Sequence, residues 1–318
     1  MNLESINHSF ITLVAKISNP ETVNDYRPIS LLNLDIKIPT KLLADRLQLV
    51  ILQLLHANQY GFIRSRTIQD CLAWCFEYIH QSHQTKKEII ILKLYFAKAF
   101  DIVEHDTILL MLQHLGFPDR WLQWIRLILS SGTSSILLNG VPGKKFKCKR
   151  GVRQGDPLSP LLFVLAAELL QYVVNDALHQ GYLKLPLAQP TNDFHNVQYA
   201  DDTILIVEAD VNQLIHLKGL LQSFATSTSL LVNYSKSSMI PINVHPERLA
   251  ILASAFGCAI GSMPFNYLGL PMGTTKPRME DLTPLMDTME RRLSSCYYSA
   301  ITPITTYAMC TLKLPAGS

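Results

Sequence analysis

The chain contains 318 residues, of which 48% are hydrophobic and 17% are charged, and its formal net charge is +3. This composition excludes an intrinsically disordered protein, because such chains carry too few apolar side chains to bury a core. The small positive charge is compatible with a nucleic-acid partner but does not indicate one by itself. The first residues, MNLESINHSF, contain neither a basic leader nor an apolar stretch, so we expect no signal peptide and a location in the cytosol or nucleus.

The first half of the chain alternates between extended and helical patterns. Residues 26–32, YRPISLL, favour an extended segment because the residue before a proline avoids helical geometry. Apolar side chains recur at helical spacing over residues 40–56, and a polar loop, NQYGFIRSR, separates this helix from another at about 67–82. The uninterrupted apolar run at 89–94 is typical of a buried strand, which leads through Tyr95 into a turn.

Four further helices are predicted after this strand, at 106–116, 119–130, 160–178 and 210–226. A tight GVPG turn between residues 134–139 and 144–149 predicts a hairpin. Residues 249–275 carry no charge but contain several glycines and prolines, which indicate a short helix, loops and a strand, not a membrane span. Strands that alternate with long helices indicate an α+β fold, with helices packed on one face of a sheet.

Asp201 and Asp202 are the clearest candidates for chemistry. They lie between two short apolar runs, which places them at the tip of a predicted hairpin. Two carboxylates held about 4 Å apart repel each other strongly unless a cation lies between them, and such hard oxygen ligands suit Mg²⁺. An ordinary aspartate-rich turn explains the same two residues, and the pair alone does not decide between these interpretations.

A second candidate is the segment RGVRQGDPLSP at 150–160, which joins a basic strand to an apolar helix. Ser159 and Pro160 suit the first turn of that helix, with Ser159 as its cap. Basic side chains in and before this segment could contact a phosphate backbone; they include Lys145, Lys147, Arg150 and Arg153. The alternative is a solvated hairpin edge that lysines protect from pairing with other strands.

Seven motifs occur in the order and at the spacing of one known family: YRPISLLN (26–33), NQYGF (58–62), KLYFAKAFD (93–101), RGVRQGDPLSPLLF (150–163), QYADD (198–202), NYSKS (233–237) and YLGLPMGTTKP (267–277). Together they resemble the reverse transcriptase domain of non-LTR, LINE-type retrotransposons, especially those of plant genomes. The resemblance implies a right-hand polymerase fold of fingers, palm and thumb with a ferredoxin-like antiparallel palm sheet. Residues 1–240 would then form fingers and palm, and residues 241–318 the palm edge and a truncated thumb.

The resemblance also implies a substrate and a set of site residues. The family extends a DNA primer along an RNA template with deoxynucleoside triphosphates, and no membrane is involved. It uses Mg²⁺ held by three palm aspartates, of which Asp201 and Asp202 match two. Phe100 matches the aromatic residue that excludes a ribose 2′-hydroxyl. The residues that match contacts to the template or the incoming nucleotide are Gln154, Gly155, Arg27, Lys37 and Lys236.

The chain departs from the family at the third aspartate, because its KLYF stands where the family pattern reads Lys-Leu-Asp-Phe. Tyr95 therefore occupies the position of the missing metal-binding carboxylate. A phenol is uncharged at neutral pH, so two metal ions would meet only two carboxylates, and Asp101 is expected to point elsewhere. We expect polymerase activity to be abolished or nearly so, since a loss of ~4 kcal/mol of transition-state stabilisation lowers a rate roughly a thousandfold.

Two other interpretations stay open. The chain could be a non-enzymatic nucleic-acid-binding remnant, in which the basic hairpin still holds a template or duplex. It could also be a pseudogene product without a stable fold, which the short connection from Ser294 to Tyr297 favours because the family has a longer helical insert there. An RNA-templated RNA polymerase fits less well, since a bulky gate at Phe100 disfavours ribonucleotides.

Overall fold

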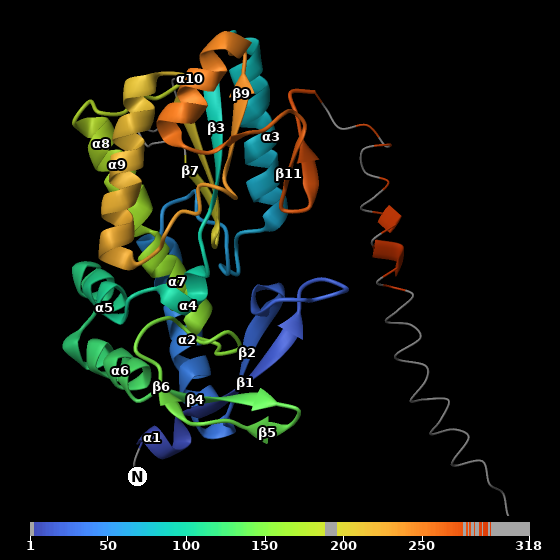
Figure 1. Ribbon diagram of the computed structural model, residues 1–318. Coiled ribbons are helices and arrows are strands. Elements are labelled where there is room, and N and C mark those ends of the chain that lie inside the picture. Colours follow the sequence, from blue (N-terminus) through green and yellow to red (C-terminus); the bar gives the residue numbers. More distant parts are fainter. Residues whose placement is uncertain are drawn as a thin grey trace, which may run out of the picture. The chain divides into compact units, whose positions relative to one another are not determined.

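The computed structural model describes residues 3–187 and 196–275, together with isolated positions between 278 and 293. The chain forms two compact units, Met1–Ser262 and Met263–Ser318 (Figure 1). The described part of the second unit contains a short antiparallel hairpin, β11 (Phe265–Tyr267) with β12 (Leu270–Met272). The predicted thumb truncation falls on positions that lie outside the described residues, and the boundary at residue 240 stays a prediction.

Five strands form the sheet in the upper part of Figure 1, in the spatial order β10, β9, β3, β8, β7. Their bounds are, in that order, Ala259–Ile260, Ser238–Ile242, Ile89–Tyr95, Asp202–Glu208 and Asn196–Tyr199. β3 is antiparallel to both β8 and β9, whereas β9 and β10 are parallel. Ile89, Ile90, Ile91 and Leu92 are each 0% exposed, so the central strand is buried on both faces, as its apolar run predicts.

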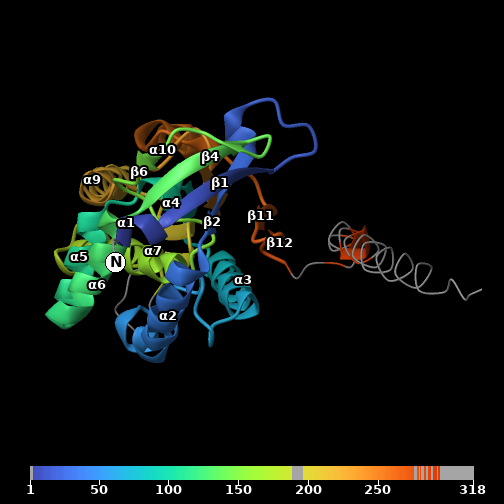
Figure 2. The same ribbon diagram turned by 90° about the horizontal axis from the view of Figure 1, so that it is seen from below.

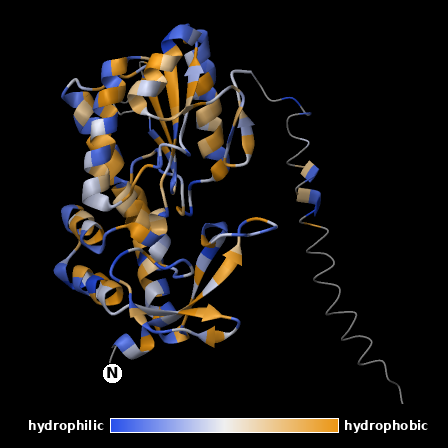
Figure 3. Ribbon diagram, in the orientation of Figure 1, coloured by the Kyte–Doolittle hydropathy of each residue, from blue (hydrophilic) through white to orange (hydrophobic). Residues whose placement is uncertain are grey.

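Helices cover both faces of this sheet. α9 (Val211–Thr228) and α10 (Pro246–Phe256) lie on one side, and α3 (Ile68–Gln84) lies on the other (Figure 2). Ile90 and Leu92 share one apolar cluster with the inner side chains of α9 and α10, and Figure 3 shows apolar residues along these strands. The expectation of helices on one face is therefore wrong, because a strand that is apolar on both sides needs cover on both.

The second sheet of the first unit follows the path β2, β1, β4, β5, with β6 paired to β4. Its strands are β1 (His8–Ala15), β2 (Tyr26–Leu32), β4 (Thr133–Leu138), β5 (Val141–Pro142) and β6 (Phe146–Lys147). β1 is antiparallel to β2 and parallel to β4. A hairpin is present, but its turn is at Asn139 and Gly140, which both have positive φ. Val141 and Pro142, predicted as part of the turn, pair with β4 as β5, and the return strand is interrupted before β6.

The remaining helices of the described residues are α1 (Leu3–Ile6), α2 (Leu34–Leu54), α4 (Ala99–Ile102), α5 (His105–His114), α6 (Asp119–Ser130), α7 (Ser159–Ala167) and α8 (Leu169–His179), with a 3₁₀ turn at Val23–Asp25. The single helix predicted at 160–178 is thus divided at Glu168. The stretch Ser159–His179 has the length and composition of a membrane-spanning helix, but 67% of its most apolar window is buried inside the protein, as in a core helix.

Candidate active site

A cavity of about 710 Å³ lies where the two sheets of the first unit approach each other. Both sheets and the 150–160 segment contribute to its walls. Most of the site residues predicted from the sequence line it together: Arg27, Tyr95, Phe100, Arg153, Gln154, Gly155, Asp201 and Asp202. The structure therefore brings residues that are far apart in the chain to one place.

The β7–β8 hairpin presents the two predicted carboxylates to this cavity. Tyr199 and Asp202 are paired across the strands, so Ala200 and Asp201 form the connecting turn. Ala200 has a φ of +57°, a left-handed conformation that is costly for a residue with a side chain. The surrounding structure holds this turn in place, because the Gln59 side-chain oxygen accepts a hydrogen bond from the Ala200 amide at 3.1 Å. The predicted hairpin tip is thus confirmed, and it has a specific support.

That support is the NQYGF loop, whose positioning role the sequence did not reveal. The backbones of Tyr60 and Gln198 are hydrogen bonded at 2.8 Å, and Gln59 also accepts from the Gly61 amide at 2.9 Å. A Cβ atom added to Gly61 would lie 2.4 Å from the Ala200 nitrogen. Only glycine allows the loop to approach the carboxylate turn this closely.

A buried polar network anchors the NQYGF loop in turn. Glu168, which is 2% exposed, accepts a hydrogen bond from the His56 amide at 2.8 Å. The Arg66 guanidinium donates to the carbonyls of His56 and Gln59. Burial raises the pKa of Glu168 to about 7, although the His56 amide and the Arg66 charge act in the opposite direction. The break between α7 and α8 therefore places a carboxyl group under the loop that supports the hairpin.

Tyr95 lies at the end of β3, directly opposite Asp202 in the antiparallel register. Residues paired in this way project to the same face of a sheet. The Lys236 ammonium lies 5.4 Å from the centre of the Tyr95 ring, a cation–π contact. The Tyr95 amide donates to the Ser237 hydroxyl at 3.1 Å, and the Tyr95 carbonyl accepts from the Asn233 amide at 2.8 Å. The backbone at the position expected to carry the third metal-binding carboxylate is thus held in place, but the side chain there is a phenol.

Asp101 lines the same cavity as Asp201 and Asp202, so the expectation that it points elsewhere is not confirmed. Its carboxylate accepts a hydrogen bond from the Gln154 side chain at 3.2 Å. The described residues contain no group of three His, Cys, Asp or Glu side chains that could hold a metal ion. Asp101 therefore does not complete the site in place of Tyr95, although both residues line the same cavity.

The cavity walls shift the carboxyl groups toward the protonated form. Desolvation raises the pKa of Asp201, while the charge of Arg27 acts in the opposite direction. The pKa of Asp202 is also raised, first by desolvation and then by repulsion from Asp201, against the charge of Lys93. Desolvation likewise raises the pKa of Asp101, which Gln154 opposes. Asp201 and Asp202 are therefore close enough to repel each other.

Phe100 and the 150–160 segment form the opposite wall. Phe100 is stacked on Phe163 with ring centres 4.4 Å apart and meets Phe62 edge-on at 5.9 Å. The Gln154 carbonyl accepts from the Ser30 amide at 2.7 Å. Gly155 has a φ of +113°, and a Cβ there would lie 2.7 Å from the Ser30 carbonyl oxygen. The segment is therefore docked on β2, and Phe100 has a fixed orientation.

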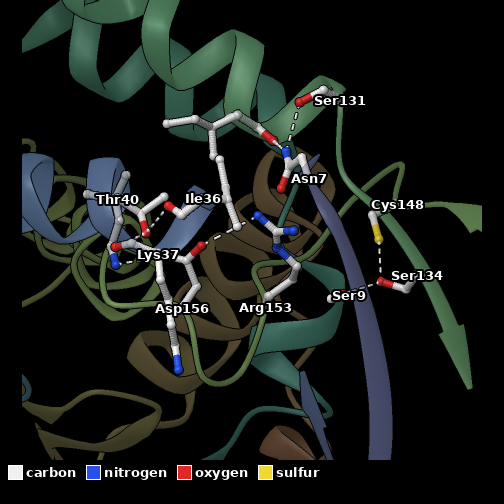
Figure 4. A network of polar contacts seen from close by, with 12 residues as sticks. Asn7, Ser9, Ile36, Lys37, Thr40, Ser131, Ser134, Cys148, Arg153 and Asp156 are labelled. Atoms are coloured by element: carbon white, nitrogen blue, oxygen red, sulfur yellow. Dashed lines mark hydrogen bonds and ion pairs between the residues drawn. The ribbon is translucent and has the colours of Figure 1, made fainter. Parts of the chain in front are cut away.

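The basic residues predicted to contact nucleic acid separate into two kinds. Arg153 has a side chain only 12% exposed and pairs with Asp156 at 3.4 Å (Figure 4). Lys145, Lys147 and Arg150 are exposed, and Arg150 lies 4.0 Å from Glu104. Arg153 therefore holds the segment together, whereas the other three are open to solvent. Their nucleic-acid contacts stay predictions.

Two details of the sequence prediction change. The Asp156 carboxylate accepts from the Leu158 amide at 2.8 Å, so Asp156, not Ser159, satisfies the start of α7; Ser159 is already the first helical residue. Lys37 lies exposed on α2 and is not among the residues that line the cavity. Conversely, Lys16 and Lys98 do line it; Lys98 lies within the motif KLYFAKAFD, and no role was predicted for either residue.

An antiparallel sheet that presents a carboxylate hairpin to a cleft below a second sheet defines the right-hand polymerase class. A solved structure supports this fold: telomerase from Candida albicans, in complex with the TWJ fragment of telomeric RNA, superposes with a TM-score of 0.55 at 17% sequence identity. The match covers 84% of this chain and 44% of that one.

Residues 16–272 match the family described as reverse transcriptase (RNA-dependent DNA polymerase), and the chain belongs to this family. It is 30% identical over 236 residues to the transposon TX1 uncharacterized 149 kDa protein of Xenopus laevis, covering 74% of this chain and 18% of that protein. It is also 30% identical over 236 residues to a Pol polyprotein from the retrotransposable element R2 of Popillia japonica, covering 72% and 33%. The chain thus spans a third or less of these relatives.

Proposed function

We propose that the chain is the polymerase region of a plant LINE-type retrotransposon protein, descended from an enzyme that extends a DNA primer along an RNA template with deoxynucleoside triphosphates. The names of the TX1 and R2 relatives support the element class. The plant type rests on the resemblance of NYSKS and YLGLPMGTTKP to the elements of plant genomes. Membership of the reverse transcriptase family supports binding of a nucleic-acid template.

Polymerisation by this chain is strongly impaired. The observation that carries this proposal is the register pair of Tyr95 with Asp202, which puts a phenol where the family has a carboxylate. The family generally uses a divalent metal, and Mg²⁺ here would meet Asp201 and Asp202 alone. The described residues therefore do not fit a two-ion arrangement, because an uncharged phenol cannot bridge two cations as a carboxylate does.

The other residues of the cleft keep their roles in this proposal. Phe100, fixed by its stacking on Phe163, excludes the 2′-hydroxyl of a ribonucleotide. Gln154 and Gly155 position the template and the incoming base, and Arg27 and Lys236 contact the nucleotide. In this proposal the cleft retains nucleotide binding and selection of deoxynucleotides but has lost catalysis of polymerisation.

Primer extension on an RNA template with Mg²⁺ tests the proposal. We expect the Tyr95→Asp variant to incorporate deoxynucleotides roughly a thousandfold faster than the wild-type chain, and Tyr95→Phe to stay as inactive as the wild type. Phe100→Ala in the Tyr95→Asp background should admit ribonucleotides. Equal incorporation by the wild type and Tyr95→Asp would contradict the proposed impairment.

A second candidate function is nucleic-acid binding without catalysis, which the exposed basic edge of β6 favours. Replacement of both Lys145 and Lys147 by Gln should lower the salt dependence of binding to an RNA–DNA duplex by about two units of slope. The same double change at Lys41 and Lys86, exposed lysines elsewhere, is the matched control. Absence of any duplex affinity at low salt would remove this candidate.

A further inference from the structure

The cleft holds more cations than its carboxylates neutralise. Lys16, Arg27 and Lys98 line it, facing Asp101, Asp201 and Asp202. Arg153 also reaches the lining, but its ion pair with Asp156 at 3.4 Å offsets its charge. Lys236 adds a fourth cation at the edge, above the Tyr95 ring. The charge of Lys93 also acts on Asp202, and the charge of Lys16 also acts on Asp25. In the described part of the cleft and at its edge, five cations thus face four carboxylates.

Tyr95 is the origin of this excess. An aspartate at the same place would bring the carboxylates level with the cations and would lie beside Asp202, its register partner. The phenol removes that negative charge and at the same time leaves Lys236 against a neutral ring. Removal of one negative charge a few ångströms from the cations changes their electrostatic interaction energy, and salt screens this change only in part.

The cations are also placed to meet an anion directly. The charge of Arg27 acts on Asp201, and the charges of Lys98 and Lys16 act on Asp101, so each of these side chains reaches the space around the carboxylates. A nucleoside triphosphate carries several negative charges and normally enters a carboxylate-rich site as its metal complex. Here the excess of protein cations can offset part of those charges without a metal.

We propose that this cleft binds a nucleoside triphosphate without a divalent cation, through Lys16, Arg27, Lys98 and Lys236. The inference rests on the proposed function in naming the nucleotide as ligand, and it follows from the misfit between this site and a metal pair. The substitution at position 95 then converts a metal-dependent catalytic site into a metal-independent binding site.

Equilibrium binding of dTTP, followed by calorimetry in Mg²⁺ and in EDTA, tests the inference. The wild-type dissociation constant should differ by less than about threefold between the two conditions. Tyr95→Asp should bind about tenfold more weakly in EDTA and recover in Mg²⁺. Wild-type binding that disappears in EDTA overturns the inference. Inorganic triphosphate, measured in the same way, should retain EDTA-resistant binding, because the contacts are made to phosphate.

The chain provides a matched control for the lysine. Lys218 lies 5.4 Å from the Tyr234 ring centre, the same separation as between Lys236 and Tyr95, but Tyr234, unlike Tyr95, is not among the residues that line the cleft. Lys236→Gln should weaken dTTP binding in EDTA severalfold, while Lys218→Gln leaves it unchanged. Equal effects of the two substitutions overturn the assignment. A failure of Tyr95→Asp to extend primers would contradict the proposed function alone, since EDTA-resistant binding by the wild type is measured separately.

Discussion

The two strand ends that meet at the cleft differ in the side chains that they present to it. The β7–β8 turn retains both carboxylates and is enclosed by the NQYGF loop through Gln59 and Gly61. The end of β3 has its backbone partners but carries Tyr95, where the resemblance to the family implies a carboxylate. Since many contacts hold the backbone at both places, the chemistry at one of them can change while the fold persists.

The largest expected effect tests whether the β7–β8 turn is still competent. In the Tyr95→Asp background, Asp201→Asn should reduce primer extension about a thousandfold, back to the wild-type level, because it removes a metal-binding carboxylate again. Asp106→Asn, at an exposed position on α5, is the control and should leave extension unchanged. Extension that survives Asp201→Asn would show that the turn does not carry the reaction.

The second effect concerns the anchor beneath the NQYGF loop. Burial raises the pKa of Glu168 to about 7, above its value of about 4.3 in an unfolded chain. Between a pH of about 4.3 and about 7 the Glu168 carboxyl group is protonated in the folded state and ionised in the unfolded chain. The unfolding free energy therefore falls as the pH rises across this interval, and the stabilising contribution of the proton is lost once the pH passes about 7. The unfolding free energy of the wild type should decline by up to ~3 kcal/mol between pH 5 and 8 because of this group, and Glu168→Gln should remove that decline.

Denaturant unfolding of the wild type and Glu168→Gln across this pH range measures the difference directly. Histidines titrate in the same window in both proteins, so only the difference between the two curves is informative. Parallel curves would mean that Glu168 is not buried with its carboxyl group under the loop.

The third effect tests the close approach of the loop to the turn. Gly61→Ala should cost ~2 kcal/mol of unfolding free energy, because its Cβ would lie 2.4 Å from the Ala200 nitrogen. Gly219→Ala makes the same chemical change inside α9, where nothing lies within 4 Å of the added atom, and should stabilise the protein by ~0.5–1 kcal/mol. Urea denaturation of both variants measures the two changes in unfolding free energy, which should have opposite signs. An unchanged unfolding free energy in Gly61→Ala would contradict the enclosure of the turn.

The smallest effect tests the backbone support at the other strand end. Ser237, which is 2% exposed, accepts from the Tyr95 amide and donates to the Asn233 carbonyl at 2.8 Å. Ser237→Ala should cost ~1–2 kcal/mol, because it leaves a buried amide without a partner. Ser235→Ala, an exposed neighbour, should change the stability by less than ~0.5 kcal/mol. Similar melting temperatures for the two variants would argue against this support.

The patterns that depend on neighbouring residues were predicted well. The apolar run of β3, the helices and the hairpin at Asp201 follow from local periodicity and turn residues. Ser159 was misassigned as a cap, because the side chain of Asp156, three residues before the helix start, accepts from the Leu158 amide instead. Lys16 carried no signal, because only the approach of two sheets makes it a neighbour of the site.

The sequence by itself determined the family, the two carboxylates and the missing third one, since these are properties of residue identity and order. Only the tertiary structure decided that Tyr95 lies opposite Asp202, that Lys236 rests on its ring and that the NQYGF loop supports the turn. Those contacts join segments separated by tens of residues or more. Their geometry comes from packing of the whole unit, which no local pattern encodes.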